Sequence, residues 1–105
     1  MDIQKYIYNQ TNVILPITGS GNGSSKDKAV IMTVDAKHIF VGVQNEYIST
    51  ILDDVHWDKV EQSLIIEDDK KLDKITIQHF TSDGEVVERL FWFDITECFG
   101  IYIST

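Results

Sequence analysis

Residues 74–93, KITIQHFTSDGEVVERLFWF, decide the fold, because they place a strong turn signal between two strand patterns. Residues 74–80 and 86–93 are rich in β-branched and aromatic side chains, as is typical of β-strands. Asp83 and Gly84 lie between them, and this dipeptide favours a tight hairpin turn because glycine readily adopts a positive φ angle. We therefore predict a β-hairpin over this stretch.

The second strand of the hairpin also indicates where the core lies. Phe91 and Phe93 share one face of that strand. Leu90 and Trp92 share the other face. A strand that is apolar on both faces is typical of a central position in a sheet. Burial of each such side chain contributes about 1.5–3 kcal/mol, so we expect this cluster to determine the core. The alternative is that the aromatic residues line a ligand pocket.

Further segments of the chain carry strand patterns. Residues 29–34 and 38–43 flank the polar loop 35–37, which predicts a second hairpin. Residues 46–52 alternate in the manner of a half-buried strand, and residues 62–67 contain a short apolar run. These patterns indicate that most of the chain is β-structure.

The sequence predicts little helix. Residues 53–62 have room for one helical turn, and residues 3–8 fit either a strand or one turn of helix. Asp94 and Glu97 have the spacing of a capping box, which allows a short helix near the C-terminus. Residues 101–103 fit a closing strand equally well.

These segments together predict one domain over residues 1–105, of the all-β or β-rich α+β class. We expect a single antiparallel sheet of about six to eight strands, curled into a sandwich or a partly closed barrel, with one short helix as an option. Residues 19–25, GSGNGSS, are expected to form a flexible loop, because glycine and serine offer little apolar surface to bury.

The rhythm of strands across residues 29–93 loosely resembles that of pleckstrin-homology-like barrels. The resemblance rests on strand order alone and implies a barrel-like fold. The basic loop with which lipid-binding members of that family grip phosphoinositides has no counterpart in this acidic chain. The resemblance therefore implies no function.

Charge is distributed unevenly along the chain. Four acidic residues are matched by four basic ones up to Leu52, whereas thirteen acidic residues face five basic ones from Asp53 onward. Binding to nucleic acid or to an anionic membrane rests largely on lysine and arginine, so neither partner is expected. A basic protein is the expected partner, because charge complementarity steers association.

The single cysteine and the N-terminus bear on the cellular compartment. Cys98 cannot form an internal disulfide, and we expect a reduced thiol buried in or near the core. Residues 1–6 lack the pattern of a secretory signal, and no apolar run approaches the roughly 20 residues that span a bilayer. These observations favour a cytoplasmic protein.

Residues 53–58, DDVHWD, are the densest group of chemically capable side chains, and they offer carboxylates beside His56 for a metal ion or for acid–base work. The stretch lacks the central glycine of a calcium loop, and the spacing of Cys98 and the histidines does not fit zinc. Residues 19–26 also lack phosphate-loop spacing. We expect no catalytic residue, metal or cofactor, and a solvated acidic turn instead.

A non-enzymatic binding protein is the leading functional hypothesis. Bacterial immunity proteins and antitoxins that neutralise nuclease toxins share this profile of size and acidity, and they act by occluding a basic partner. The residues expected to contact the partner are Asp53, Asp54, Trp57, Asp58, Glu61, Glu67, Asp68 and Asp69. The alternatives are a small metal- or ligand-dependent enzyme that uses residues 53–58, and a structural or assembly module.

Overall fold

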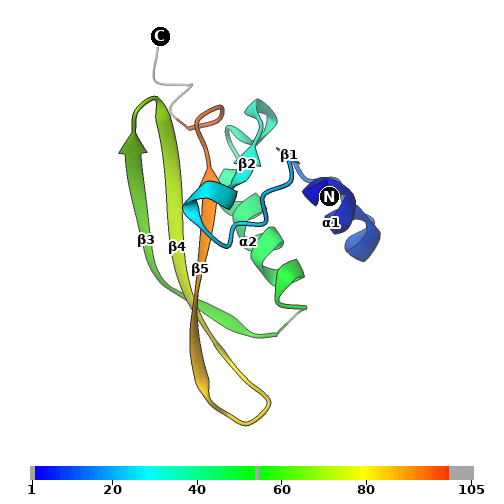
Figure 1. Cartoon of the computed structure of the whole chain (residues 1–105). Coiled ribbons are helices and arrows are strands. Elements are labelled where there is room, and N and C mark those ends of the chain that lie inside the picture. Colours follow the sequence, from blue (N-terminus) through cyan, green and yellow to red (C-terminus); the bar gives the residue numbers. More distant parts are fainter. Residues whose placement is uncertain (1, 54, 100–105) are drawn as a thin grey trace.

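The computed structural model describes residues 2–53 and 55–99. Within these residues, two α-helices and two short 3₁₀ turns accompany one five-stranded sheet. The elements are α1 (Ile3–Thr11), β1 (Ile17–Thr18), η1 (Lys26–Lys28), β2 (Val30–Met32), η2 (Val34–Ala36), α2 (Phe40–Ile51), β3 (Trp57–Glu67), β4 (Lys70–Phe80) and β5 (Val86–Asp94). Both α-helices lie on the same side of the sheet (Figure 1).

The strand order is β1-β2-β5-β4-β3, with β2 parallel to β5 and every other pair antiparallel. The prediction of a β-rich α+β fold is confirmed. The predictions of an all-β chain, of six to eight strands and of a wholly antiparallel sheet are wrong. In the described part of the chain the sheet does not close into a barrel, so the partly closed barrel and the resemblance to pleckstrin-homology-like barrels do not hold, and the curled sandwich is not confirmed.

The hairpin predicted over residues 74–93 is confirmed. β4 and β5 pair without interruption from the Phe80–Val86 pair to the Leu72–Asp94 pair. Gly84 adopts a φ of 84°, and its N–H donates to the carbonyl of Thr81 at 2.9 Å, as the turn signal implied. β5 occupies the predicted central position, between β2 and β4.

The region 38–52 differs most from the prediction. Neither the strand expected at 38–43 nor the one at 46–52 forms, because the chain folds into α2. The buried residues of α2 are Val43, Gln44, Tyr47 and Ile48, and this spacing repeats every helical turn. The unfavourable helix propensities of valine, isoleucine and phenylalanine amount to at most about 0.7 kcal/mol each, which burial of one helix face easily exceeds.

Three shorter segments also differ from, or decide between, the predicted structures, because packing selects among conformations that the local sequence allows equally well. The loop at 35–37 belongs to a 3₁₀ turn rather than to a hairpin, and residues 57–62 extend β3 instead of forming a helical turn. Residues 3–8 lie in α1, where the Asp2 carboxylate accepts the N–H of Gln4 at 2.9 Å. The predicted strand at 62–67 is confirmed.

The expected C-terminal helix is a turn in the structure. The carboxylate of Asp94 accepts both the N–H and the hydroxyl of Thr96, at 3.0 and 2.6 Å, in place of capping a helix. Cys98 is fully buried, as predicted. Residues 101–103, the expected closing strand, lie outside the described residues.

The loop at 19–25 runs along the sheet beside β5. The carbonyl of Gly23 accepts the N–H of Trp92 at 2.8 Å, and the N–H of Gly23 donates to Lys28 at 2.7 Å. The φ of Gly23 is 85°, and a Cβ there would lie 3.3 Å from the carbonyl oxygen of Trp92. Glycine is therefore required where the loop meets the strand. The flexibility of the remaining loop stays a prediction.

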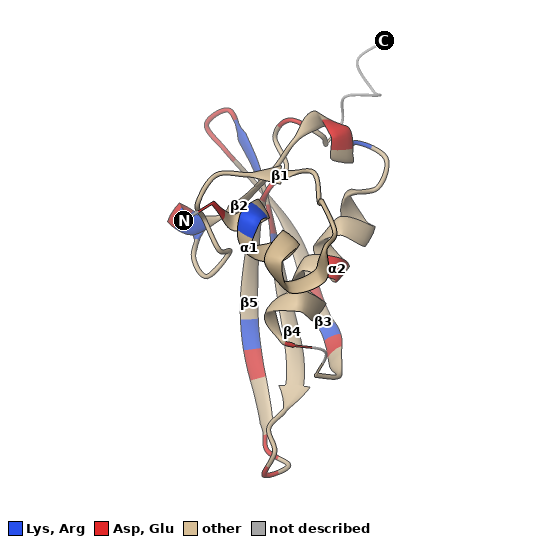
Figure 2. Cartoon of the chain, turned by 90° about the vertical axis from the view of Figure 1, so that its right-hand side faces the viewer, with Lys and Arg blue, Asp and Glu red and all other residues tan. Residues whose placement is uncertain are grey.

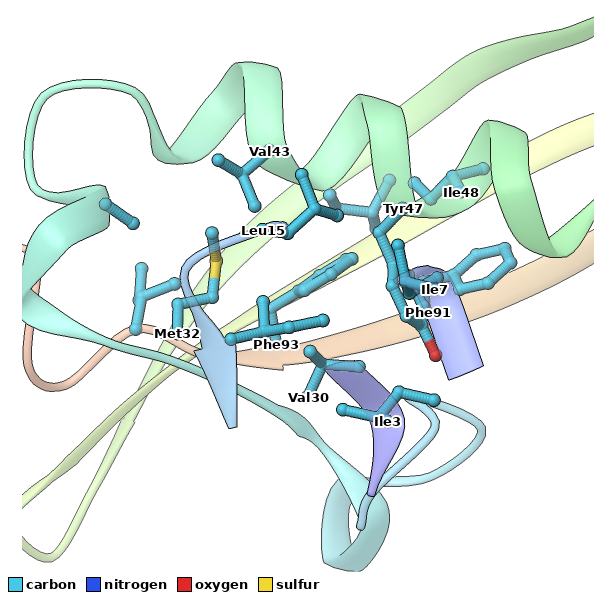
Figure 3. Packing of buried hydrophobic residues seen from close by; sticks show 14 of the residues in the cluster. Ile3, Ile7, Leu15, Val30, Met32, Val43, Tyr47, Ile48, Phe91 and Phe93 are labelled. Carbon is cyan, nitrogen blue, oxygen red and sulfur yellow. The ribbon is translucent and has the colours of Figure 1, made fainter. Parts of the chain in front are cut away.

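The core forms between α2 and the face of the sheet that α2 covers (Figure 3). The ring of Tyr47 meets Phe93 and Phe91 edge to face, with centroids 5.7 and 6.4 Å apart. Its hydroxyl donates to the carbonyl of Asn22 at 2.7 Å, which ties α2 to the loop at 19–25. Tyr47 therefore joins helix, sheet and loop, and its burial raises the pKa of the phenol.

A polar contact joins α2 to β3 and β4. The carboxylate of Asp73 is only 3% exposed and accepts the side-chain amides of Gln44 and Gln62, at 2.7 and 2.5 Å. A buried carboxylate without such donors would be costly, so these two amides make the position acceptable. The contact also fixes the spacing between α2 and the edge strand β3.

Replacing Tyr47 by phenylalanine is expected to lower the free energy of unfolding by about 1 kcal/mol at neutral pH, because one part-buried hydrogen bond is lost. The difference should shrink as the pH rises above about 10. There the unfolded phenol ionises while the buried one keeps its proton, so ionisation destabilises only the tyrosine protein. Urea denaturation of both proteins across this pH range measures the effect, and a constant difference would contradict it.

Replacing Asp73 by alanine is expected to lower the free energy of unfolding by about 2–3 kcal/mol, because the amides of Gln44 and Gln62 lose their acceptor. The same change at exposed Asp69 should cost less than about 0.5 kcal/mol. Chemical denaturation of the two variants makes the comparison, and equal losses would show that the contact contributes nothing specific.

Candidate functional site

Strand geometry divides the side chains of β3, β4 and β5 between two faces of the sheet. One face is covered by α2 and carries the buried residues Ile75, Ile77, Phe91 and Phe93. We call the opposite face of these strands the open face. The register places on it Asp58, Glu61, Ser63, Ile65, Glu67, Lys70, Leu72, Lys74, Thr76, Gln78, Phe80, Val86, Glu88, Leu90, Trp92 and Asp94.

The two faces carry opposite charge. The open face has five carboxylates and two ammonium groups, from Asp58, Glu61, Glu67, Glu88, Asp94, Lys70 and Lys74. The covered face of the same strands has three basic residues, Lys59, Lys71 and Arg89, and the single carboxylate of Asp73. Among the residues of these three strands, the acidic excess therefore lies on the open face, while further acidic residues lie in the turns.

Apolar side chains run through this acidic surface. Leu90 is 41% exposed, and Trp92 is half-buried beneath the ammonium of Lys74, which lies 5.6 Å from the ring centroid. Phe80 and Val86 pair across the hairpin near its tip, and both are more than half exposed. Exposed aromatic and aliphatic residues within a polar rim are the usual composition of a protein-binding surface.

One end of the open face is hollowed. A pocket of about 510 Å³ lies between η1 and the β3–β4 turn, lined by Lys26, Asp27, Ala29, Ile31, Glu67, Asp68, Asp69, Lys70, Leu72 and Asp94. The ammonium of Lys26 lies 2.6 Å from the carboxylate of Glu67 across it. Both side chains are about half exposed, so solvent screens the ion pair and it contributes little to stability. Acidic residues outnumber basic ones around the pocket, which suits a cationic side chain.

The structure does not bring the eight predicted contact residues into one patch. Asp53 precedes β3, and Trp57, Asp58 and Glu61 lie in its first half, whereas Glu67 ends the strand and Asp68 and Asp69 follow it. A rise of about 3.3 Å per residue places Glu67 roughly 20 Å from Glu61 and roughly 30 Å from Asp58. Figure 2 shows acidic residues toward both ends of β3. Asp54 lies outside the described residues. Of this set, the open face gathers Asp58, Glu61 and Glu67. Their role in binding a partner stays a prediction.

Trp57 has a structural contact on the covered face. Its indole N–H donates to the hydroxyl of Ser49 on α2 at 3.0 Å, and its ring packs against the core. The residue therefore fastens the start of β3 to α2. Trp92, two residues before Asp94, is the tryptophan that lies on the open face.

Sequence reasoning did not assign Glu88, Leu90, Trp92 or Asp94 to the site. The signal was present, because these residues alternate with Phe91 and Phe93 and must point the other way. Only the position of α2 shows which of the two faces is covered.

The alternative enzymatic site around His56 is exposed to solvent. Its Nε2 atom lies 3.5 Å from the Asp58 carboxylate, and the two side chains are 78% and 68% exposed. Acid–base and metal chemistry generally depend on a recessed site that excludes water. Within residues 2–53 and 55–99, no group of three or more His, Cys, Asp or Glu side chains is arranged to hold a metal ion. Burial raises the pKa of the Cys98 thiol, which disfavours the reactive thiolate.

Comparison of the chain with known protein families, curated proteins and solved structures gave no match. Neither α1 nor α2, the two α-helices in the described part of the chain, has the length and apolar character that a bilayer span requires.

Replacing Trp57 by phenylalanine is expected to lower the free energy of unfolding by about 1 kcal/mol, because the hydrogen bond to Ser49 is lost while the ring remains. Ser49→Ala should cost a similar amount, and combining both changes should cost clearly less than their sum, since they remove the same bond. Urea denaturation of the single and double variants measures this coupling. Strictly additive losses would contradict a direct role of the contact.

Proposed function

We propose that this protein is a non-enzymatic acidic binding protein that inhibits a basic protein by covering it with the open face. An immunity protein or antitoxin that neutralises a nuclease toxin in the bacterial cytoplasm fits this chemistry. The observation that supports the proposal is that the side of the sheet left free by α2 carries five carboxylates along its length, together with the exposed Leu90 and the half-buried Trp92.

The proposed mechanism is competition for cationic side chains. A nuclease holds phosphates with lysine and arginine, and carboxylates spaced along adjacent strands offer those side chains alternative partners. Glu61 on β3 and Glu88 on β5 are exposed and lie on either side of β4, so they present charge across the breadth of the hairpin. Charge of this kind mainly accelerates association and selects the partner.

Affinity in this mechanism depends on the apolar centre of the surface. Leu90 and Trp92 are adjacent on the open face of β5, and the Lys74 ammonium over the indole leaves part of the ring accessible. Tryptophan is over-represented among residues that dominate binding energy. We therefore assign the anchoring role to Trp92, while the carboxylates around it guide the encounter.

The test compares two variants that change the net charge equally. Glu61→Gln combined with Glu88→Gln removes two carboxylates from the open face. Asp35→Asn combined with Glu46→Gln removes two exposed carboxylates from η2 and α2, and serves as the matched control. The partner is captured from lysate of the source organism with the unmodified protein, identified, purified and assayed for nuclease activity.

The open-face variant should slow association with the purified partner by about threefold to tenfold at low salt, and the control by less than about twofold. Raising the ionic strength should reduce this difference, because salt screens exposed charges. Trp92→Ala should instead accelerate dissociation. Surface plasmon resonance measures both rates. Equal association rates for the two charge variants, or a partner whose activity is unaffected by binding, would overturn the proposal.

A further inference from the structure

The edge strand β3 has one side of its backbone available for pairing. Its register with β4 accounts for one side only, and no other segment of residues 2–53 or 55–99 pairs with it. The strand is 11 residues long, which is more than most edge strands. Unpaired N–H and C=O groups along such an edge form a template for another extended chain.

The regular part of this edge is limited to residues 61–67. The ladder with β4 is uninterrupted from the Glu61–Thr76 pair to the Glu67–Lys70 pair, whereas a bulge disturbs it between Lys59 and Glu61. Bulges, lysine and proline are common devices that prevent pairing at sheet edges. Residues 61–67, EQSLIIE, contain neither lysine nor proline.

The side chains of this segment show what an added strand must offer. On the covered face Leu64 is 45% exposed and Ile66 is 65% exposed, because they lie in a part of the edge that α2 leaves uncovered. On the open face the segment presents Glu61 at one end and Glu67 at the other, and the half-exposed Glu67 carboxylate also contacts Lys26. An extended partner would therefore place apolar side chains beside Leu64 and Ile66, and cationic ones beside the two glutamates.

A second copy of this chain does not meet these requirements. Antiparallel pairing of residues 61–67 with themselves centres on Leu64 and sets Glu61 against Glu67 of the other copy twice. Like charges directly opposite each other destabilise a strand pair. The acids at both ends of the segment thus select against self-association while they attract a basic strand.

We propose that the basic partner binds by adding an extended segment, with alternating apolar and basic residues, to the free edge of β3 at residues 61–67. This proposal rests on the proposed function and adds the mode of binding. Main-chain hydrogen bonds to the edge would hold the segment, and its alternating side chains would provide selectivity.

The test uses a synthetic nine-residue peptide that alternates arginine and valine and has blocked ends. Two matched controls are N-methylated forms of the same peptide, one methylated on the odd-numbered residues and the other on the even-numbered residues. A third control has glutamate in place of arginine. N-methylation on the pairing side removes backbone donors without altering charge or side chains. Fluorescence anisotropy measures binding, and hydrogen exchange monitored by NMR locates it.

The arginine–valine peptide should bind and slow the exchange of alternate amides within residues 61–67. One of the two N-methyl peptides should bind at least about tenfold more weakly, and the glutamate version should not bind. Equal binding of all N-methyl forms, absence of binding by the arginine–valine peptide, or protection confined to β5 would overturn strand addition. The proposed function is tested separately, by the association rates of the two charge variants with the captured partner, and none of these peptide outcomes changes that test.

Two proline variants provide an independent arm. Neighbouring residues in an antiparallel strand alternate between an N–H directed at the partner strand and one directed away. Of Leu64→Pro and Ile65→Pro, one therefore removes an N–H that pairs with β4, and the other removes an N–H at the free edge. The variant that retains the unfolding midpoint of the parent should lose peptide binding by about tenfold or more. Leu64→Thr and Ile65→Thr keep the N–H and are the controls. Undiminished peptide binding by the folded proline variant would contradict the proposal. The proposal would also be contradicted if the parent protein formed a dimer that this proline variant abolished, because a second copy would then occupy the edge.

Discussion

The edge-to-face packing of Tyr47 against Phe91 and Phe93 is the contact on which the rest of the structure depends. It seats α2 on one side of β5, the central strand. Because the aromatic residues of β5 alternate, seating the helix on one set leaves Leu90 and Trp92 on the other side of the sheet. The same contact thus fixes the core and determines which residues remain available to a partner.

Because α2 covers only one face of the sheet, the two faces differ in the charged residues that they can accommodate. The covered face accepts one buried carboxylate, Asp73, and this side chain requires two amide donors. Additional acidic residues at the buried positions of that face would each need similar compensation. The open face imposes no such cost, because exposed carboxylates stay hydrated. Burial therefore keeps acidic residues from the covered positions of the sheet, and the open face is a surface with one dominant sign.

The sequence allowed prediction of the hairpin at 74–93 and of the burial of Cys98, because turn chemistry and local alternation are properties of neighbouring residues. It did not allow prediction of α2. Residues 38–52 are rich in residues that favour strands, and only their contact with Phe91 and Phe93, about 45 positions away in the chain, makes the helical spacing decisive. The parallel pairing of β2 with β5 depends in turn on α2, since a parallel connection needs a crossover.

The same limit applies to the candidate site. Acidic residues could be counted from the sequence, but their assignment to faces required the register of three strands. Residues that looked like one patch, such as Asp58 and Asp69, are separated by the length of β3. This separation gives the acids a second physical role: those at 61 and 67 bracket an otherwise unprotected edge. Repulsion between glutamates disfavours pairing of the edge with an acidic strand, including a second copy of this chain. The same glutamates do not repel a basic strand, so the edge remains available to one.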